Sequence, residues 1–190
     1  MNNNQNIQLL RAAQYGDLPR ALAALKNGAN INARDRGLTV RHWAAQEGHL
    51  FVVRALLESG ARVSVRGTLD DDVKLLHKAI GEQHSRVALL LIKSGADLNA
   101  FSHDTQSTPL HTACAYGYLR GVKLLLKYGA DTRVKDKNGR TPLYWAGVYG
   151  HLKITELVRM RRRKAVTKPN RSSRLMAAQL VVRGHKQSAG

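Results

Sequence analysis

Cysteine is almost missing from this sequence, since Cys114 is the only one among 190 residues. A single cysteine excludes an intrachain disulfide and leaves a cysteine-based zinc site without the partners it needs. A reducing compartment is therefore the expected environment. Long apolar runs are missing too. Stretches such as 87–92 are far shorter than the roughly 20 residues of a membrane-spanning helix, so no transmembrane segment is predicted.

The first six residues have neither the cationic start nor the apolar run of a secretory signal, and Asn2 stands where myristoylation requires glycine. We therefore expect an intracellular, cytoplasmic protein. Acidic residues are scarce: 13 Asp and Glu stand against 31 Lys and Arg, which gives a formal net charge of +18. Such an excess raises the question of an anionic partner, and the answer depends on where the charge lies.

The sequence does contain a repeat. The pair Gly-Ala recurs at intervals of 32, 35 and 34 residues, starting at Gly28, Gly60, Gly95 and Gly129. A second marker, small residues followed by glycine, keeps the same register and ends at Gly16, Gly48, Gly117 and Gly150. The third copy has Gln83 in place of this glycine. Two independent markers with one period near 33 residues indicate a repeat protein.

Each unit predicts two short helices and a turn. In the fourth unit, Thr108 can cap the first helix, Pro109 is tolerated in its first turn, and Gly117 ends it. A second helix is predicted over 119–128, where apolar residues recur at helical spacing before Gly129. Because a single helix pair cannot bury its apolar face, stacked units must supply the core.

These motifs resemble the ankyrin repeat signature. The resemblance rests on Thr108-Pro109-Leu110-His111, on Thr141-Pro142-Leu143-Tyr144, and on the Gly-His-Leu steps at 48–50 and 150–152. It implies an all-α helical solenoid of five helix-turn-helix repeats over 1–158, followed by a basic, partly disordered C-terminal tail at 159–190. The units are expected at about 6–37, 38–70, 71–106, 107–139 and 140–158. Units two and three depart from the signature by lacking the proline.

The resemblance also implies a monomeric, non-catalytic protein-interaction module. It would bind a protein partner through its concave face and finger turns, without a cofactor, a metal or a small-molecule substrate. Residues that differ between units at matched positions are those that the scaffold does not fix. They form the candidate partner-binding set: Tyr15, Arg36, Leu38, Glu47, Asp70, Asp71, Asp72, Glu82, Thr105, Tyr116, Lys137, Arg140 and Tyr149.

Three tyrosines of this set, Tyr15, Tyr116 and Tyr149, occupy one matched position. Tyrosine offers a large contact area with a polar tip, which suits an interface anchor. Packing against the neighbouring helix is the alternative. Trp43 and Trp145 share another matched position, where we expect partial burial between repeats rather than contact with a partner. The acidic run 70–72 is either a solvated finger or the edge of an interface.

Residues with reactive side chains receive structural roles. Six of the eight histidines recur with the repeat, which indicates hydrogen-bonded turns rather than metal or acid–base sites. Cys114 matches Ala45 and Gly147 and is expected to be a buried core thiol. Neither a Ser-His-Asp pattern nor a phosphate-binding glycine loop occurs, so no enzymatic activity is predicted. Asn99 is similar to the ankyrin asparagines that hydroxylases modify.

The charge is concentrated in the tail, where 159–190 contains ten Lys and Arg and no acidic residue. Its core is a cluster that consists of Arg159, Arg161, Arg162, Arg163 and Lys164. Three roles fit this cluster: a polar end cap, a nuclear import sequence, and a grip on phosphates or an anionic leaflet. The alternative function is therefore a nucleic-acid or anionic-membrane binder driven by the tail. A free-standing chain with an Asn-rich start also fits an effector that an intracellular bacterium delivers into a host.

Overall fold

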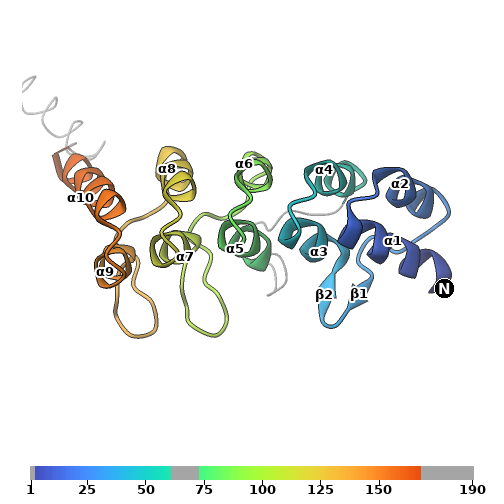
Figure 1. Cartoon of the computed structure of the whole chain (residues 1–190), viewed down its shortest axis with the longest axis horizontal. Helices are drawn as coiled ribbons and strands as arrows, with labels where there is room; N and C mark the ends of the chain where they lie inside the picture. Colours follow the sequence, from blue (N-terminus) through green and yellow to red (C-terminus); the bar gives the residue numbers. More distant parts are fainter. Residues whose placement is uncertain (1–2, 61–72, 168–190) are drawn as a thin grey trace, which may run out of the picture.

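The computed structural model describes residues 3–60 and 73–167. Within these ranges the chain forms five helix pairs, stacked in a row with the odd-numbered helices in one layer and the even-numbered helices in the other (Figure 1). The pairs are α1 (Asn3–Tyr15) with α2 (Leu18–Lys26), α3 (Val40–Gln46) with α4 (Leu50–Glu58), α5 (Val73–Gly81) with α6 (Ser85–Lys93), α7 (Pro109–Ala115) with α8 (Leu119–Tyr128), and α9 (Pro142–Val148) with α10 (Leu152–Thr167). The predicted helical solenoid is confirmed.

The helices begin and end where the local sequence predicts. The N–H and the hydroxyl of Thr108 both donate to Nδ1 of His111, at 3.1 and 2.9 Å, and α7 starts at the next residue. Helix α8 covers the predicted range and stops at Gly129, whose φ of 98° lies in the left-handed region. These capping interactions join residues that are close in the chain, so the local sequence can predict them.

The core lies between the two layers and between neighbouring pairs. Its largest fully buried apolar side chains are distributed along the row: Leu9, Val40, Val52, Leu56, Ile80, Val87, Leu91, Leu110, Val122 and Leu125. Burial of one such side chain contributes about 1.5–3 kcal/mol. The second, third and fourth units contribute three each and the first contributes Leu9, so these side chains are buried by neighbouring units and the stability of the solenoid depends on stacking.

Histidines join neighbouring units at the turns, as the repeat predicts. Nε2 of His49 donates to the carbonyl of Gln14 at 2.9 Å, and His84 and His151 make the same bond to Gln46 and Ala115. Each ring lies against the glycine that ends the first helix of the preceding unit. A Cβ at Gly48, for example, would lie 2.5 Å from Nδ1 of His84. The glycine is therefore required for the close approach as well as for the turn.

The third unit, which lacks this glycine, uses a different contact. Gln83 takes the left-handed conformation with a φ of 61°. In the next unit, Tyr118 stands at the position that histidine occupies in the other units. Its hydroxyl donates to the carbonyl of Gln83 at 2.9 Å. The loss of glycine and the loss of histidine thus occur together at one contact between units.

Two features differ from the expectation. Strands β1 (Arg34–Asp35) and β2 (Leu38–Thr39) pair antiparallel in the first finger, around Arg36 and Gly37 with φ values of 50° and 77°. Strands of two residues are too short to leave an alternating pattern in the sequence.

At the other end of the solenoid, α10 continues from Leu152 through Thr167 without a break at residue 158. The remainder of the tail, 168–190, lies outside the described residues.

Candidate functional site

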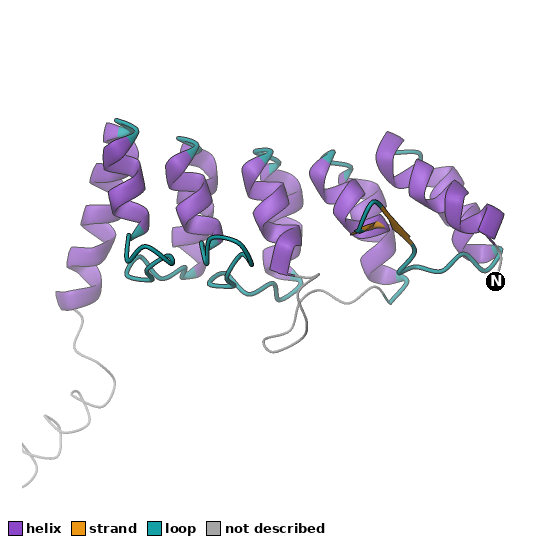
Figure 2. Cartoon of the chain, turned by 90° about the horizontal axis from the view of Figure 1, so that it is seen from below, coloured by secondary structure: helices purple, strands orange, loops and turns teal. Residues whose placement is uncertain are grey.

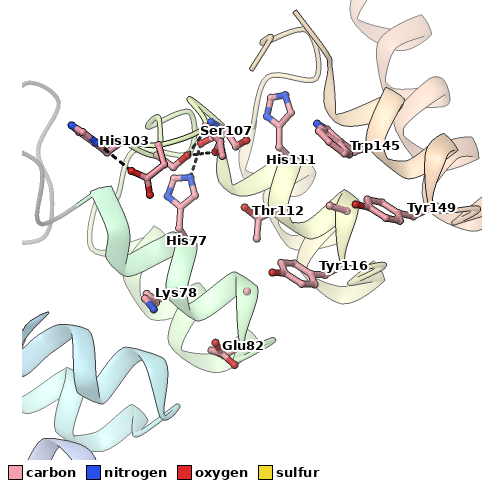
Figure 3. A pocket seen from close by; sticks show the side chains of 15 residues that line it. His77, Lys78, Glu82, His103, Ser107, His111, Thr112, Tyr116, Trp145 and Tyr149 are labelled. Carbon is pink, nitrogen blue, oxygen red and sulfur yellow. Dashed lines mark hydrogen bonds and ion pairs between the residues drawn. The ribbon is translucent and has the colours of Figure 1, made fainter. Parts of the chain in front are cut away.

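A groove of about 750 Å³ on the inner layer contains several candidate residues, and we call it the inner groove. Helices α5, α7 and α9 form one wall, and the finger 102–107 forms the other (Figure 3). Its lining residues are His77, Lys78, Gly81, Glu82, Ser102, His103, Asp104, Thr105, Ser107, His111, Thr112, Ala115, Tyr116, Trp145 and Tyr149. Seen from below, the long loops that join successive pairs lie along one side of the row of helices (Figure 2).

An aromatic wall closes the groove on the side of α9. The rings of Trp145 and Tyr149 are stacked, with centroids 5.9 Å apart and an interplanar angle of 15°. Tyr149 is 55% exposed and Tyr116, the residue directly after α7, is 65% exposed. Both tyrosines therefore offer most of their rings to a partner, although Tyr149 also packs against Trp145.

Asp136 fixes this aromatic wall from behind. The Nε1–H of Trp145 donates to Oδ2 of Asp136 at 2.8 Å, and the N–H groups of Asn138 and Arg140 donate to Oδ1 at 2.9 Å. Burial alone would raise the pKa of Asp136, but these hydrogen bonds outweigh it and hold the pKa below its ordinary value. The guanidinium of Arg140 covers the Trp145 ring at 5.1 Å. The tryptophan is thus held in one orientation.

The finger wall is fixed by hydrogen bonds as well. The hydroxyls of Ser102 and Thr105 lie 2.7 Å apart, and the N–H of Ser107 donates to Oγ of Ser102. Nε2 of His77 donates to the Ser107 carbonyl at 2.8 Å, which ties the finger to α5. Nζ of Lys137, from the next finger, donates to the carbonyl of Asp104 at 2.7 Å. A groove with both walls fixed loses little conformational entropy when it binds a ligand.

Both ring nitrogens of the buried histidine in the groove are engaged in hydrogen bonds. Nδ1 of His111 accepts from Thr108, and Nε2 donates to the carbonyl of Arg140 at 3.0 Å, so the ring is neutral with its proton on Nε2. Burial lowers the pKa of His111 below 6.5, against the opposing effect of its hydrogen bond to Arg140. Cys114 is fully buried, as predicted, and burial raises the pKa of its thiol to about 12.

The structure brings together four of the residues predicted to bind a partner: Glu82, Thr105, Tyr116 and Tyr149. Lys137 and Arg140 lie just behind the groove, where they brace its finger and its tryptophan. Four others lie in the first two units: Tyr15 at the end of α1, Arg36 in the hairpin turn, Leu38 in β2 and Glu47 at the end of α3. The run 70–72 lies outside the described residues.

One set of matched residues that lines the groove was not predicted from the sequence. Trp145 is half-buried, as expected, but its ring also lines the groove, together with Lys78 and Thr112 at the matched position. These three residues each lie four positions before one of Glu82, Tyr116 and Tyr149. The spacing i, i+4 places two side chains on one face of a helix, so the signal was available in the sequence.

The basic cluster of the tail begins within a helix. Arg159, Arg161 and Arg163 are exposed on α10, and Arg162 is half-buried. Lys164 belongs to the same helix.

None of the helices in the described residues has the length and apolarity to cross a membrane. The described part of the chain also contains no group of three His, Cys, Asp or Glu side chains placed to hold a metal ion.

Comparison with known proteins gives one consistent family. A profile of ankyrin repeats (three copies) matches residues 9–102 and 100–168. Similar proteins include a probable E3 ubiquitin-protein ligase XBOS32 of Oryza sativa (34% identical over 60% of this chain), the ARF GTPase-activating protein Git of Drosophila melanogaster (36% over 47%) and the palmitoyltransferase AKR1 of Lachancea kluyveri (34% over 57%). The matched segments are only 23%, 12% and 15% of these relatives' own lengths. With the profile spanning most of its residues and five stacked helix pairs in its structure, the chain belongs to the ankyrin repeat family.

Proposed function

We propose that the chain is a non-catalytic interaction module that binds a protein partner in its inner groove. Ankyrin repeats are protein-protein interaction modules in general, and the choice of the groove is our own inference. The observation that carries it is a groove with fixed walls and two largely exposed tyrosines, Tyr116 and Tyr149, which directly follow the neighbouring helices α7 and α9. Aromatic side chains in such positions provide a large share of binding energy at protein interfaces.

The groove also has polar groups that can orient a partner. Lys78 and Glu82 lie on the helical wall (Figure 3). Asp104 is exposed on the finger wall. We expect an extended segment of the partner to insert an apolar or cationic side chain against the tyrosines, because aromatic faces attract both kinds. The polar groups at the rim would then set its direction.

We propose that the chain has no catalytic activity of its own. Two of the relatives are named as a ligase and a palmitoyltransferase, but this chain matches only 23% and 15% of their lengths. In the described residues, the thiol of Cys114 is buried with a raised pKa, and both nitrogens of His111 are engaged in hydrogen bonds. A buried, protonated thiol is a poor nucleophile.

A matched pair of variants tests the groove. Peptides that bind the full chain are selected from a random displayed library, and their affinities are then measured for two variants. The double variant Tyr116→Ala, Tyr149→Ala should weaken binding at least about tenfold, as loss of interface anchors does. The control, Tyr15→Ala, removes the tyrosine at the matched position outside the groove, where 77% of the residue is exposed. It should leave affinity unchanged.

Two results would contradict the proposal. One is undiminished binding by the folded double variant, which would place the interface elsewhere. The other is an equal loss in Tyr15→Ala, which would indicate an interface along the whole row of tyrosines. Circular dichroism of each variant separates loss of binding from loss of fold.

The alternative function, an anionic ligand bound by the basic tail, is favoured by one observation: Arg159 and Arg161 are exposed on α10.

A further inference from the structure

Basic side chains cover the outer layer of the solenoid at its C-terminal half. Helices α6, α8 and α10 carry six exposed cations ahead of the tail cluster, and we call this set the outer cationic face. Its members are Arg86, Lys93, Arg120, Lys123, Lys127 and Lys153. They lie on the layer opposite the inner groove (Figure 1).

The six cations share one register. On α8 they occupy positions i, i+3 and i+7, namely Arg120, Lys123 and Lys127, which lie on one stripe of a helix. Arg86 and Lys93 occupy the first and last of these positions on α6, and Lys153 the first on α10. Positions seven residues apart are about 10 Å apart along a helix, and packed helices lie about 8–10 Å apart. The result is a grid of charges across three neighbouring helices.

The grid is local and does not simply reflect the high net charge. At the matched positions α2 has Pro19, Leu22 and Lys26, and α4 has Phe51, Arg54 and Glu58. These two helices together carry two cations and one anion there, against five cations and no anion on α6 and α8. On the stripes of α6, α8 and α10, the single acidic side chain is Glu156. The composition of the outer layer therefore changes between the second and third units, although the stacking is the same.

We propose that the outer cationic face docks the protein onto an anionic lipid surface. The three helices follow one another in the outer layer (Figure 1), so an extended anionic surface on that layer can meet cations of more than one helix. Apolar side chains are exposed on the same layer, since Leu152 is 79% and Met160 51% exposed on α10. A mixture of cations and exposed apolar side chains is typical of surfaces that lie in a membrane interface.

A nucleic-acid ligand fits this face less well. Interfaces with nucleic acids combine Arg and Lys with Asn, Gln, Ser and Thr side chains, and these polar side chains help to fix the register on phosphates and base edges. Helices α6, α8 and α10 contain no Asn or Gln, and their stripes contain no Ser or Thr over 85–163. The face supplies charge without the polar groups that would set a register on a duplex.

The experiment measures binding of the full chain to vesicles of phosphatidylcholine with about 30% phosphatidylserine, compared with phosphatidylcholine alone, at about 0.15 M salt, where the Debye length is about 8 Å. Each cation near an anionic leaflet contributes about fivefold in affinity. The variant Lys123→Gln, Lys127→Gln should therefore bind about 25-fold more weakly. The control, Lys26→Gln with Arg54→Gln, removes the same charge from α2 and α4 and should change affinity by less than about threefold, because charges beyond a Debye length are screened.

Each outcome decides the proposal. Selective loss in the α8 variant, with the tyrosine variant of the groove still bound to vesicles, supports it and separates it from the proposed function. Equal losses in both lysine variants would attribute binding to net charge and overturn it. Failure of the wild-type chain to bind serine-containing vesicles would overturn it too, and binding of a DNA duplex instead would identify a nucleic acid as the ligand. Should the α8 variant lose its circular dichroism signal, Arg86→Gln with Lys153→Gln tests the same face.

Discussion

Replacement of Gly117 by alanine should destabilise the solenoid more than the same change at Gly150. Both glycines end a first helix in the left-handed region, with φ values of 67° and 69°. A Cβ at Gly117 would lie 2.6 Å from Cε1 of His151, whereas a Cβ at Gly150 would meet nothing within 4 Å. The two sites therefore share the backbone conformation and differ in the ring of the following unit.

The magnitudes follow from these contacts. An alanine in the left-handed conformation costs about 1–2 kcal/mol relative to glycine, and this cost applies to both variants. At Gly117 the ring of His151 must also move, which breaks its 3.2 Å hydrogen bond to the Ala115 carbonyl. Loss of that bond costs about 1 kcal/mol, and loosened packing between the units adds to it. We expect Gly117→Ala to lower the free energy of unfolding by about 1–2 kcal/mol more than Gly150→Ala.

Urea unfolding of the full chain, followed by far-ultraviolet circular dichroism, measures this difference. A double-mutant cycle then identifies its source. In the background of His151→Ala there is no ring to displace, so Gly117→Ala should cost no more than Gly150→Ala does in the native chain. Equal costs of the two glycine variants in the native chain would refute the reasoning, since the strain common to both would then be the whole effect.

Three further results are expected from the buried groups. The thiol of Cys114, buried with a pKa of about 12, should react with a thiol reagent only after unfolding in urea, and reaction of the folded chain at the rate of free cysteine would contradict this. Because burial holds the pKa of His111 below 6.5, the unfolded chain binds more protons just below that pH. The free energy of unfolding should therefore fall as the pH is lowered through this range, and His111→Gln should flatten the decline measured by urea unfolding. Tyr118→Phe removes the bond to the Gln83 carbonyl and should cost about 1 kcal/mol by the same measurement.

The sequence predicts those features that depend on neighbouring residues. The limits of α8 follow from apolar spacing and from Gly129, and the start of α7 from Thr108. The break in composition at residue 159 predicted the end of the repeats, yet α10 runs on through Thr167. Arginine, lysine and methionine are strong helix formers, so the charge run does not stop the helix that it follows.

The site was harder to predict because it depends on how units stack. Matched positions led to the proposal of Tyr116 and Tyr149, both of which line the inner groove, since a scaffold constrains the residues that it buries and leaves the others free. They did not show that the groove is confined to α5, α7, α9 and one finger, nor that Trp145 lines it. Which column of a short helix faces the finger depends on the packing of neighbouring units, and periodicity within one helix does not report that.

The two proposed surfaces lie on opposite layers of one stack, and this has an energetic consequence. The inner groove uses side chains of α5, α7 and α9, whereas the outer cationic face uses those of α6, α8 and α10, with the buried core between them. Sites without shared side chains contribute additively. The lysine variant of α8 should therefore leave peptide affinity unchanged, and vesicle-bound protein should bind groove peptides as tightly as free protein. A change in peptide affinity on vesicles would mean that one ligand covers both layers or that the stack deforms on docking.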